Sequence, residues 1–126
     1  MTTEREAEQL LTAFATSGVA TVRELCADDV TVYGTDEGER WGNLEGLCAA
    51  LEAMRALGLS AKWETAPVDH GGWIAGVALY SVPGQGVVPV RVTLVFENRK
   101  LVHGHFSLEQ RTVPASAPAP PTALGV

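Results

Sequence analysis

The stretch ADDVTVYGTDEGERWGNLEGL, residues 27–47, contains a strand, a loop and the start of a helix in direct succession. Residues 30–34 are rich in β-branched and aromatic side chains, which is typical of a strand. Residues 34–42 combine three glycines with several charged side chains, and this composition predicts a loop. Asn43 is a common helix cap, and the apolar residues that follow it recur at helical spacing. The stretch therefore predicts a strand, an exposed loop and a helix over residues 43–58.

The sequence before this stretch predicts two helices. Residues 4–18 place apolar side chains at helical spacing, with Thr2 or Thr3 as the expected cap and Gly18 as the expected end. Residues 19–29 repeat the pattern over a shorter span, in which we expect Cys26 to be helical.

The sequence after residue 58 changes from helical to extended character. Four strands are expected over residues 59–69, 73–82, 87–98 and 100–112, separated by turn sequences that contain glycine or asparagine. The predicted order is α-α-β-α-β-β-β-β. Residues 113–126 are rich in proline and alanine and should form a loose tail.

Composition indicates one acidic globular domain. The chain has 126 residues, of which 46% are hydrophobic and 19% are charged, with a net charge of −6. We expect one domain over residues 1–112 and no binding to nucleic acids or to anionic membranes, because no basic surface is available to neutralise phosphates. The two cysteines suit buried thiols of a reducing compartment, so we expect a cytoplasmic protein. Abundant alanine, glycine, valine and arginine suggests a GC-rich bacterial genome.

The order of these elements, together with residues 27–47 and the closing HGHFS sequence of residues 103–107, resembles the nuclear transport factor 2-like superfamily, and within it the SnoaL-like domains. The resemblance covers roughly residues 5–112. It implies an α+β fold in which a cone-shaped, curved, mixed or antiparallel sheet wraps around three helices and encloses a pocket. It also implies a homodimer formed through the outer face of the sheet.

The superfamily includes enzymes and non-catalytic proteins, so the fold alone does not determine the function. Comparison with the ketosteroid isomerase pattern puts the catalytic base at Gly34, the tyrosine near Leu10 and the acid near Val92, and none of these residues can perform the reaction. A shift of the loop would bring Asp36 to the position of the missing base. We find no equivalent of the Asp-Arg-Asp arrangement of epoxide hydrolases, because Arg91 has no acidic neighbours on its strand.

The glycine-rich loop contains the candidate catalytic residues, Asp36 and Glu39. One of them could act as a general base if partial burial raised its pKa. The alternative is a structural role, in which Thr35 and Asp36 form a side-chain-to-backbone turn and Glu39 pairs with Arg40 or another basic residue at the surface.

Strand alternation predicts which side chains line the pocket. The apolar faces of residues 87–98 and 100–112, together with two tryptophans, give the candidate pocket residues Trp41, Trp63, Val92, Leu94, Phe96, Phe106 and Leu108. We expect Val102 and Gly104 to share this apolar face. The opposite face gives the candidate dimer interface, which consists of Arg91, Thr93, His103, His105 and Ser107.

The histidines leave three roles open. His103 and His105 favour a structural or interface role; they would lie in the pocket if the facing were inverted, and a metal site is the third alternative. We expect no metal, because zinc needs three or four ligands, and no cofactor. His70 precedes two glycines and is expected in a turn.

The sequence supports two candidate functions. The first is a small-molecule-binding SnoaL-like protein that uses acid-base catalysis without a cofactor, as an isomerase, cyclase or dehydratase would, on an apolar or carbonyl-bearing metabolite. The second is a non-catalytic dimerisation or ligand-sensing module of the same fold, whose pocket is filled by its own side chains.

Overall fold

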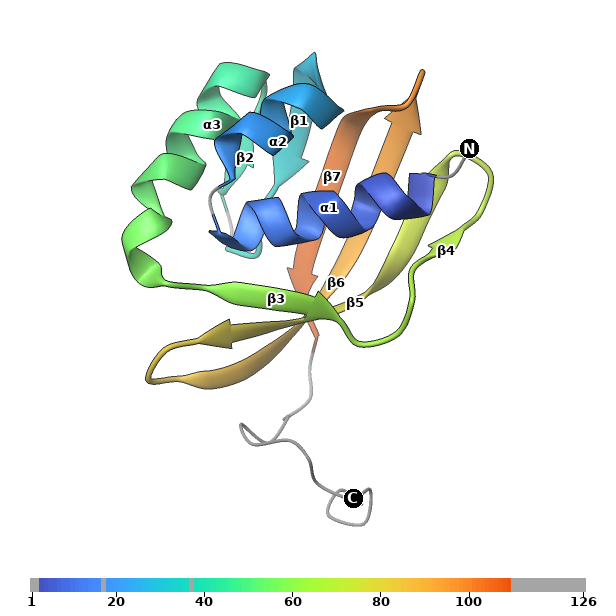
Figure 1. Cartoon of the computed structure of the whole chain (residues 1–126). Helices are drawn as coiled ribbons and strands as arrows, with labels where there is room; N and C mark the ends of the chain where they lie inside the picture. The colour runs from blue at the N-terminus through green and yellow to red at the C-terminus, as the bar shows by residue number, and fades with distance from the viewer. Residues whose placement is uncertain (1–2, 17, 37, 110–126) are drawn as a thin grey trace.

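A computed structural model describes residues 3–16, 18–36 and 38–109, and Figure 1 shows helices packed on one face of a curved sheet. The helical elements are α1 (Thr3–Thr16), α2 (Val19–Leu25), α3 (Leu44–Ala53) and the short 3-10 helix η1 (Arg55–Leu57). The strands are β1 (Cys26–Tyr33), β2 (Arg40–Trp41), β3 (Ser60–Trp63), β4 (Val68–Asp69), β5 (Trp73–Val82), β6 (Gly86–Glu97) and β7 (Lys100–Leu108).

The sheet has the order β2-β1-β7-β6-β5-β3, and β4 pairs with β5 beside β3. All strand pairs are antiparallel except β1 and β7, which run parallel and bring the first and last strands together. Helix α1 crosses the face of β5, β6 and β7, while α2 and α3 lie toward β1 (Figure 1). The predicted α+β class and curved mixed sheet are confirmed.

Three predicted boundaries were wrong. Cys26 begins β1 rather than lying in a helix, because α2 ends at Leu25. The expected loop over residues 34–42 contains the short strand β2, which pairs with β1. The single strand expected over residues 59–69 is split into β3 and β4, which both pair with β5.

A bulge near the start of β7 changes which of its side chains are buried. Val95 of β6 pairs with His103, but Phe96 pairs with Leu101, so Val102 is the extra residue. Leu101 is completely buried and takes the inward position that alternation assigned to Val102. One extra residue in a strand moves every side chain beyond it to the opposite face of the sheet. Alternation in the sequence does not reveal where such an extra residue lies.

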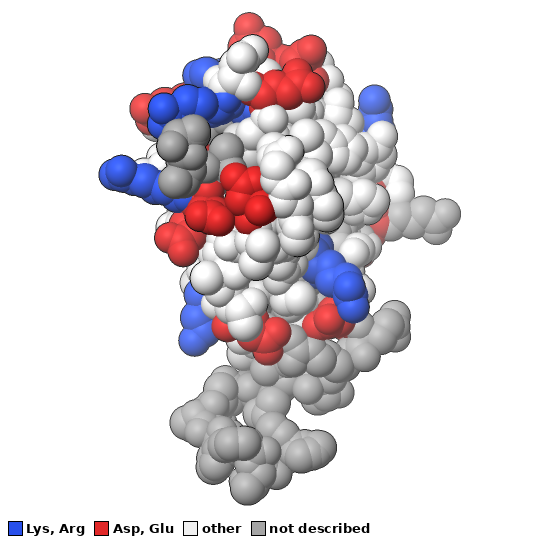
Figure 2. Space-filling model, turned by 90° about the vertical axis from the view of Figure 1, so that its right-hand side faces the viewer, with Lys and Arg blue, Asp and Glu red and all other residues white. Residues whose placement is uncertain are grey.

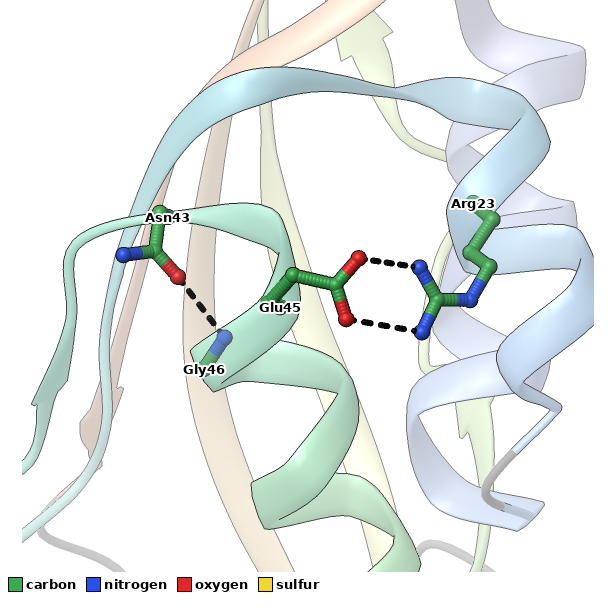
Figure 3. Close-up of polar contacts among 4 residues, drawn as sticks. All are labelled: Arg23, Asn43, Glu45 and Gly46. Atoms are coloured by element: carbon green, nitrogen blue, oxygen red, sulfur yellow. Dashed lines mark hydrogen bonds and ion pairs between the residues drawn. The ribbon is translucent and has the colours of Figure 1, made fainter.

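The start of α3 is fixed by a cap and by an ion pair with α2 (Figure 3). The side chain of Asn43 accepts a hydrogen bond from the Gly46 N–H at 2.7 Å, as the sequence predicted. Both guanidinium nitrogens of Arg23 donate to the Glu45 carboxylate, at 2.7 and 3.1 Å. The hydrogen bond and charge of Arg23 lower the pKa of Glu45.

The closed core lies between the helices and the inner face of the sheet. Its completely buried members include Leu10 of α1, Ile74 of β5 and Val30 of β1. Both cysteines are buried and free. Burial raises the pKa of the Cys26 thiol to about 12, with a smaller contribution from the nearby Cys48. The thiols therefore contribute as small apolar groups rather than as nucleophiles.

Candidate functional site

A cavity of about 230 Å³ lies between α3 and the inner face of the sheet. The helices and the segment after them supply Phe14, Leu47, Leu51, Met54 and Leu59. The sheet supplies Val32, Tyr80, Val82, Val88, Val90, Phe106 and Leu108. The segment between β1 and the end of β2 adds Gly34, Thr35, Glu39 and Trp41. Among the described residues the wall is therefore mostly apolar, and Thr35, Glu39 and Tyr80 contribute polar side chains to it.

Glu39 supplies a carboxylate to this wall. Its side chain is half-buried and folds over Gly34, where a Cβ atom would come within 2.9 Å of the Glu39 Cβ and 3.0 Å of its Cδ. The N–H of Asp36 donates to Glu39 Oε1 at 3.2 Å, and the N–H of Gly34 donates to the Glu39 carbonyl at 3.0 Å. The absence of a side chain at Gly34 thus makes room for the carboxylate of Glu39.

The neighbouring charged residues point elsewhere. Arg40 donates from Nε to the Tyr33 hydroxyl at 3.3 Å, and its guanidinium lies 5.8 Å from the centre of the Tyr33 ring. The alternative pairing of Glu39 with Arg40 is not observed, and within the described residues Glu39 has no ion-pair partner. Asp36 is exposed and is not part of the cavity wall.

Tyr80 adds a hydroxyl group to the wall from β5. Its side chain is largely buried, and this burial raises its pKa, so the phenol keeps its proton at neutral pH. A neutral phenol can donate a hydrogen bond to a carbonyl oxygen.

The predicted pocket residues fall into two groups. Trp41, Phe106 and Leu108 line the cavity. Val92, Leu94 and Phe96 belong to the closed core instead, because the cavity borders only the first half of β6. Trp63 packs against β5 at Gly76, where a Cβ would come within 2.9 Å of its ring, and its buried Nε1 has no hydrogen-bond partner within the described residues.

The predicted interface residues lie together on the outer face of the sheet. In the register of β6 and β7, Arg91 is opposite Ser107 and Thr93 is opposite His105. His103 and His105 are also paired with Thr31 and Tyr33 of β1. These side chains are partly or fully exposed, on the face away from the helices.

His70 lies in the turn between β4 and β5, with its ring 4.4 Å from that of Trp73. In the part of the chain that the structure describes, no three histidine, cysteine, aspartate or glutamate side chains are grouped as metal ligands. No helix within residues 3–16, 18–36 and 38–109 is long and apolar enough to cross a membrane.

No protein-family model matches the sequence, and no curated protein is significantly similar to it. Solved structures do match. A protein of Kribbella flavida, proposed to be a ketosteroid isomerase, is 13% identical over 97% of this chain and 86% of its own, with a TM-score of 0.76. A proposed isomerase of the SnoaL-like family from Agrobacterium tumefaciens is 16% identical over 86% of this chain and 99% of its own, with a TM-score of 0.72.

IdmH of Streptomyces antibioticus, proposed to be a polyketide cyclase, is similar at a TM-score of 0.69, with 15% identity over 86% of this chain and 93% of its own. Identities this low establish the fold alone. The chain therefore has the fold of nuclear transport factor 2-like and ketosteroid isomerase-like proteins, as the resemblance implied.

The helical side of the cavity was not predicted from the sequence. Leu47 and Leu51 of α3 and Met54 after it form much of that wall. Their spacing of three and four residues marks the inward face of the helix. It does not distinguish a side chain in the closed core from one beside a cavity, because both face inward.

Proposed function

We propose that this protein binds a small, mostly apolar carbonyl compound in the cavity and moves a proton on it without a cofactor. The observation that carries the proposal is the Glu39 carboxylate, which folds over Gly34 in an otherwise mostly apolar wall. The family resemblance assigns the catalytic base to residue 34, where this chain has no side chain. Glu39 would supply the carboxylate from five residues further along the chain.

The size of the cavity limits the ligand. A cavity of about 150 Å³ lined by apolar side chains is large enough for benzene. A cavity of about 230 Å³ suits a ligand with one ring or two small fused rings rather than a four-ring steroid. Four aromatic side chains, Phe14, Trp41, Tyr80 and Phe106, favour a flat or cyclic ligand.

The proposed step is a proton transfer beside a carbonyl group. The Glu39 carboxylate takes a proton from the carbon next to the carbonyl, and the electron pair of that C–H bond forms the enolate. The resulting carboxylic acid returns a proton to the same or another carbon of the enolate. Such positioned proton transfer contributes about 10²- to 10⁴-fold to a rate.

Exchange of α-protons in D₂O tests this function without knowledge of the natural substrate. Indan-1-one is a two-ring ketone of suitable size, and proton NMR follows the loss of its α-proton signal. We expect exchange above the rate in buffer alone, and indane, which lacks the carbonyl, should compete for the cavity. Binding of both compounds without accelerated exchange would instead support the non-catalytic ligand-sensing module.

Gly34→Ala tests whether the space above Gly34 positions the carboxylate. The new methyl group would force the Glu39 side chain away, and we expect the exchange rate to fall about tenfold to a hundredfold while the fold is kept. Gly42→Ala is the matched control, because the atoms nearest its Cβ would belong to the movable end of Arg40, at 3.2 Å. Equal rates in both variants would contradict the assigned position of Glu39.

We also propose that two copies of the chain pair through the outer face of the sheet. This face contains the half-buried apolar side chains Val77, Leu79 and Val95, and Trp73 at its edge is 43% exposed. The adjoining side of the molecule, which contains β4 in Figure 1, has a broad area without charged side chains (Figure 2). A second copy would cover this apolar surface. We expect the pair to act in the cytoplasm, where its two buried thiols stay reduced.

A further inference from the structure

The outer face of the sheet contains a cluster of three rings from two adjacent strands. The ring of Tyr33 in β1 lies 5.5 Å from the ring of His103 and 5.5 Å from the ring of His105. The two imidazoles are 6.4 Å apart on β7. Because β7 lies between β1 and β6, the backbone that holds both histidines is fixed on both sides.

The charged groups around this cluster include both basic and acidic side chains. Arg40 of β2 contacts Tyr33, and Arg91 of β6 lies opposite Ser107 and forms an ion pair with Glu109 at 3.4 Å. Further away, Asp29 is exposed on β1, two residues before Thr31. Glu97 and Lys100 lie opposite each other in the register of β6 and β7, next to the turn that joins these strands. His70 stacks on Trp73 of β5. Trp73 is opposite Val95 of β6, and Val95 is in turn opposite His103 of β7. Within the described residues no carboxylate lies within ion-pair distance of either imidazole.

We propose that protonation of His103 and His105 separates the paired subunits, so that the homodimer exists only while these histidines are neutral. The inference rests on the pairing proposed above. A two-fold contact presents the same surface from both copies, so the interface would contain four of these imidazoles and two Arg91 side chains. Protonation would add up to four positive charges to an interface in which Glu109 is already paired with Arg91, and each added charge would have to lose water when the subunits pair.

The direction of the pH effect follows from linkage. The separated subunits bind more protons than the dimer, so lowering the pH favours separation and raising it favours pairing. Histidine is the side chain that changes charge between about pH 5 and 8. Aspartate and glutamate remain mostly ionised over the upper part of this range, so the histidines would dominate the response.

Sedimentation velocity of the full chain at about pH 8 and about pH 5.7 tests the proposal. We expect twice the 13.3 kDa mass of the chain at the higher pH and the single mass at the lower pH, with the dissociation constant rising about a hundredfold or more. The double variant His103→Gln/His105→Gln should remain dimeric at both pH values. His70→Gln is the matched control, because it removes the remaining histidine, and it should dissociate as the unmodified protein does.

Each other outcome is decisive. A dimer at both pH values would overturn the pH dependence and leave the pairing intact, whereas a monomer at both would overturn the pairing and the inference together. Continued acid dissociation of the double variant would assign the effect to other groups and overturn the proposal. If the double variant does not pair at the higher pH, the single variants decide, because each should shift the dissociation midpoint to lower pH, and an unchanged midpoint in both overturns the proposal.

Discussion

Glu39→Gln should lower the rate of α-proton exchange in indan-1-one by at least about a hundredfold. The amide has nearly the shape of the carboxylate and can still accept the hydrogen bond from the Asp36 N–H, so the loop should keep its conformation. It cannot take a proton from carbon at neutral pH. The measurement is the exchange rate by NMR at saturating ketone, together with the dissociation constant of indane, which should change little because indane offers no group for Glu39 to contact.

Asp36→Asn is the control, since it changes a carboxylate of the same loop that is exposed and outside the cavity wall. We expect an exchange rate within about twofold of the unmodified protein. If Asp36→Asn removed the exchange and Glu39→Gln left it intact, Asp36 would be the proton acceptor, as a shifted loop would require. Loss of exchange in neither variant would show that the reaction depends on neither of these two carboxylates.

The strands that were correctly predicted are those with strong alternation or β-branched content, such as β5 and β6. The errors occur where pairing, rather than propensity, determines the structure. The two-residue strands β2 and β4 exist because β1 and β5 offer them partners, and a segment of two residues has no periodicity to detect. Cys26 joins β1 because it pairs with Leu101, a contact between residues far apart in the sequence.

The candidate site was only partly predicted, again because contacts between segments far apart in the sequence decide where it lies. Glu39 and Trp41 were identified from the composition of their loop, and both line the cavity. Val92 and Leu94 share the inward face of β6 with the cavity residue Val90, yet they lie in the closed core. Alternation specifies a face of the sheet, but the position of a cavity along that face depends on where the helices cover it.

Leu10→Ala should destabilise the protein by about 3 kcal/mol, within the range of about 2–5 kcal/mol observed for buried leucines. Leu10 is completely buried in α1, which crosses the sheet and contacts β3, β4 and β5. Truncation removes apolar contacts and leaves a void that the rigid sheet cannot close. Alanine favours a helix at least as strongly as leucine, so the loss would come from packing rather than from the helix itself. Urea denaturation followed by tryptophan fluorescence measures the free energy of unfolding.

Leu57→Ala makes the matched comparison, because the same atoms are removed from a side chain that is 56% exposed in η1. We expect a loss below about 0.5 kcal/mol, since surface substitutions away from special features rarely exceed that value. Similar losses at both positions would mean that α1 is not packed on the sheet as described. The comparison also bears on the site, because Phe14 lies one turn after Leu10 on α1 and lines the cavity. If α1 packs as described, Leu10→Ala should weaken indane binding as well as stability, whereas Leu57→Ala should leave both unchanged.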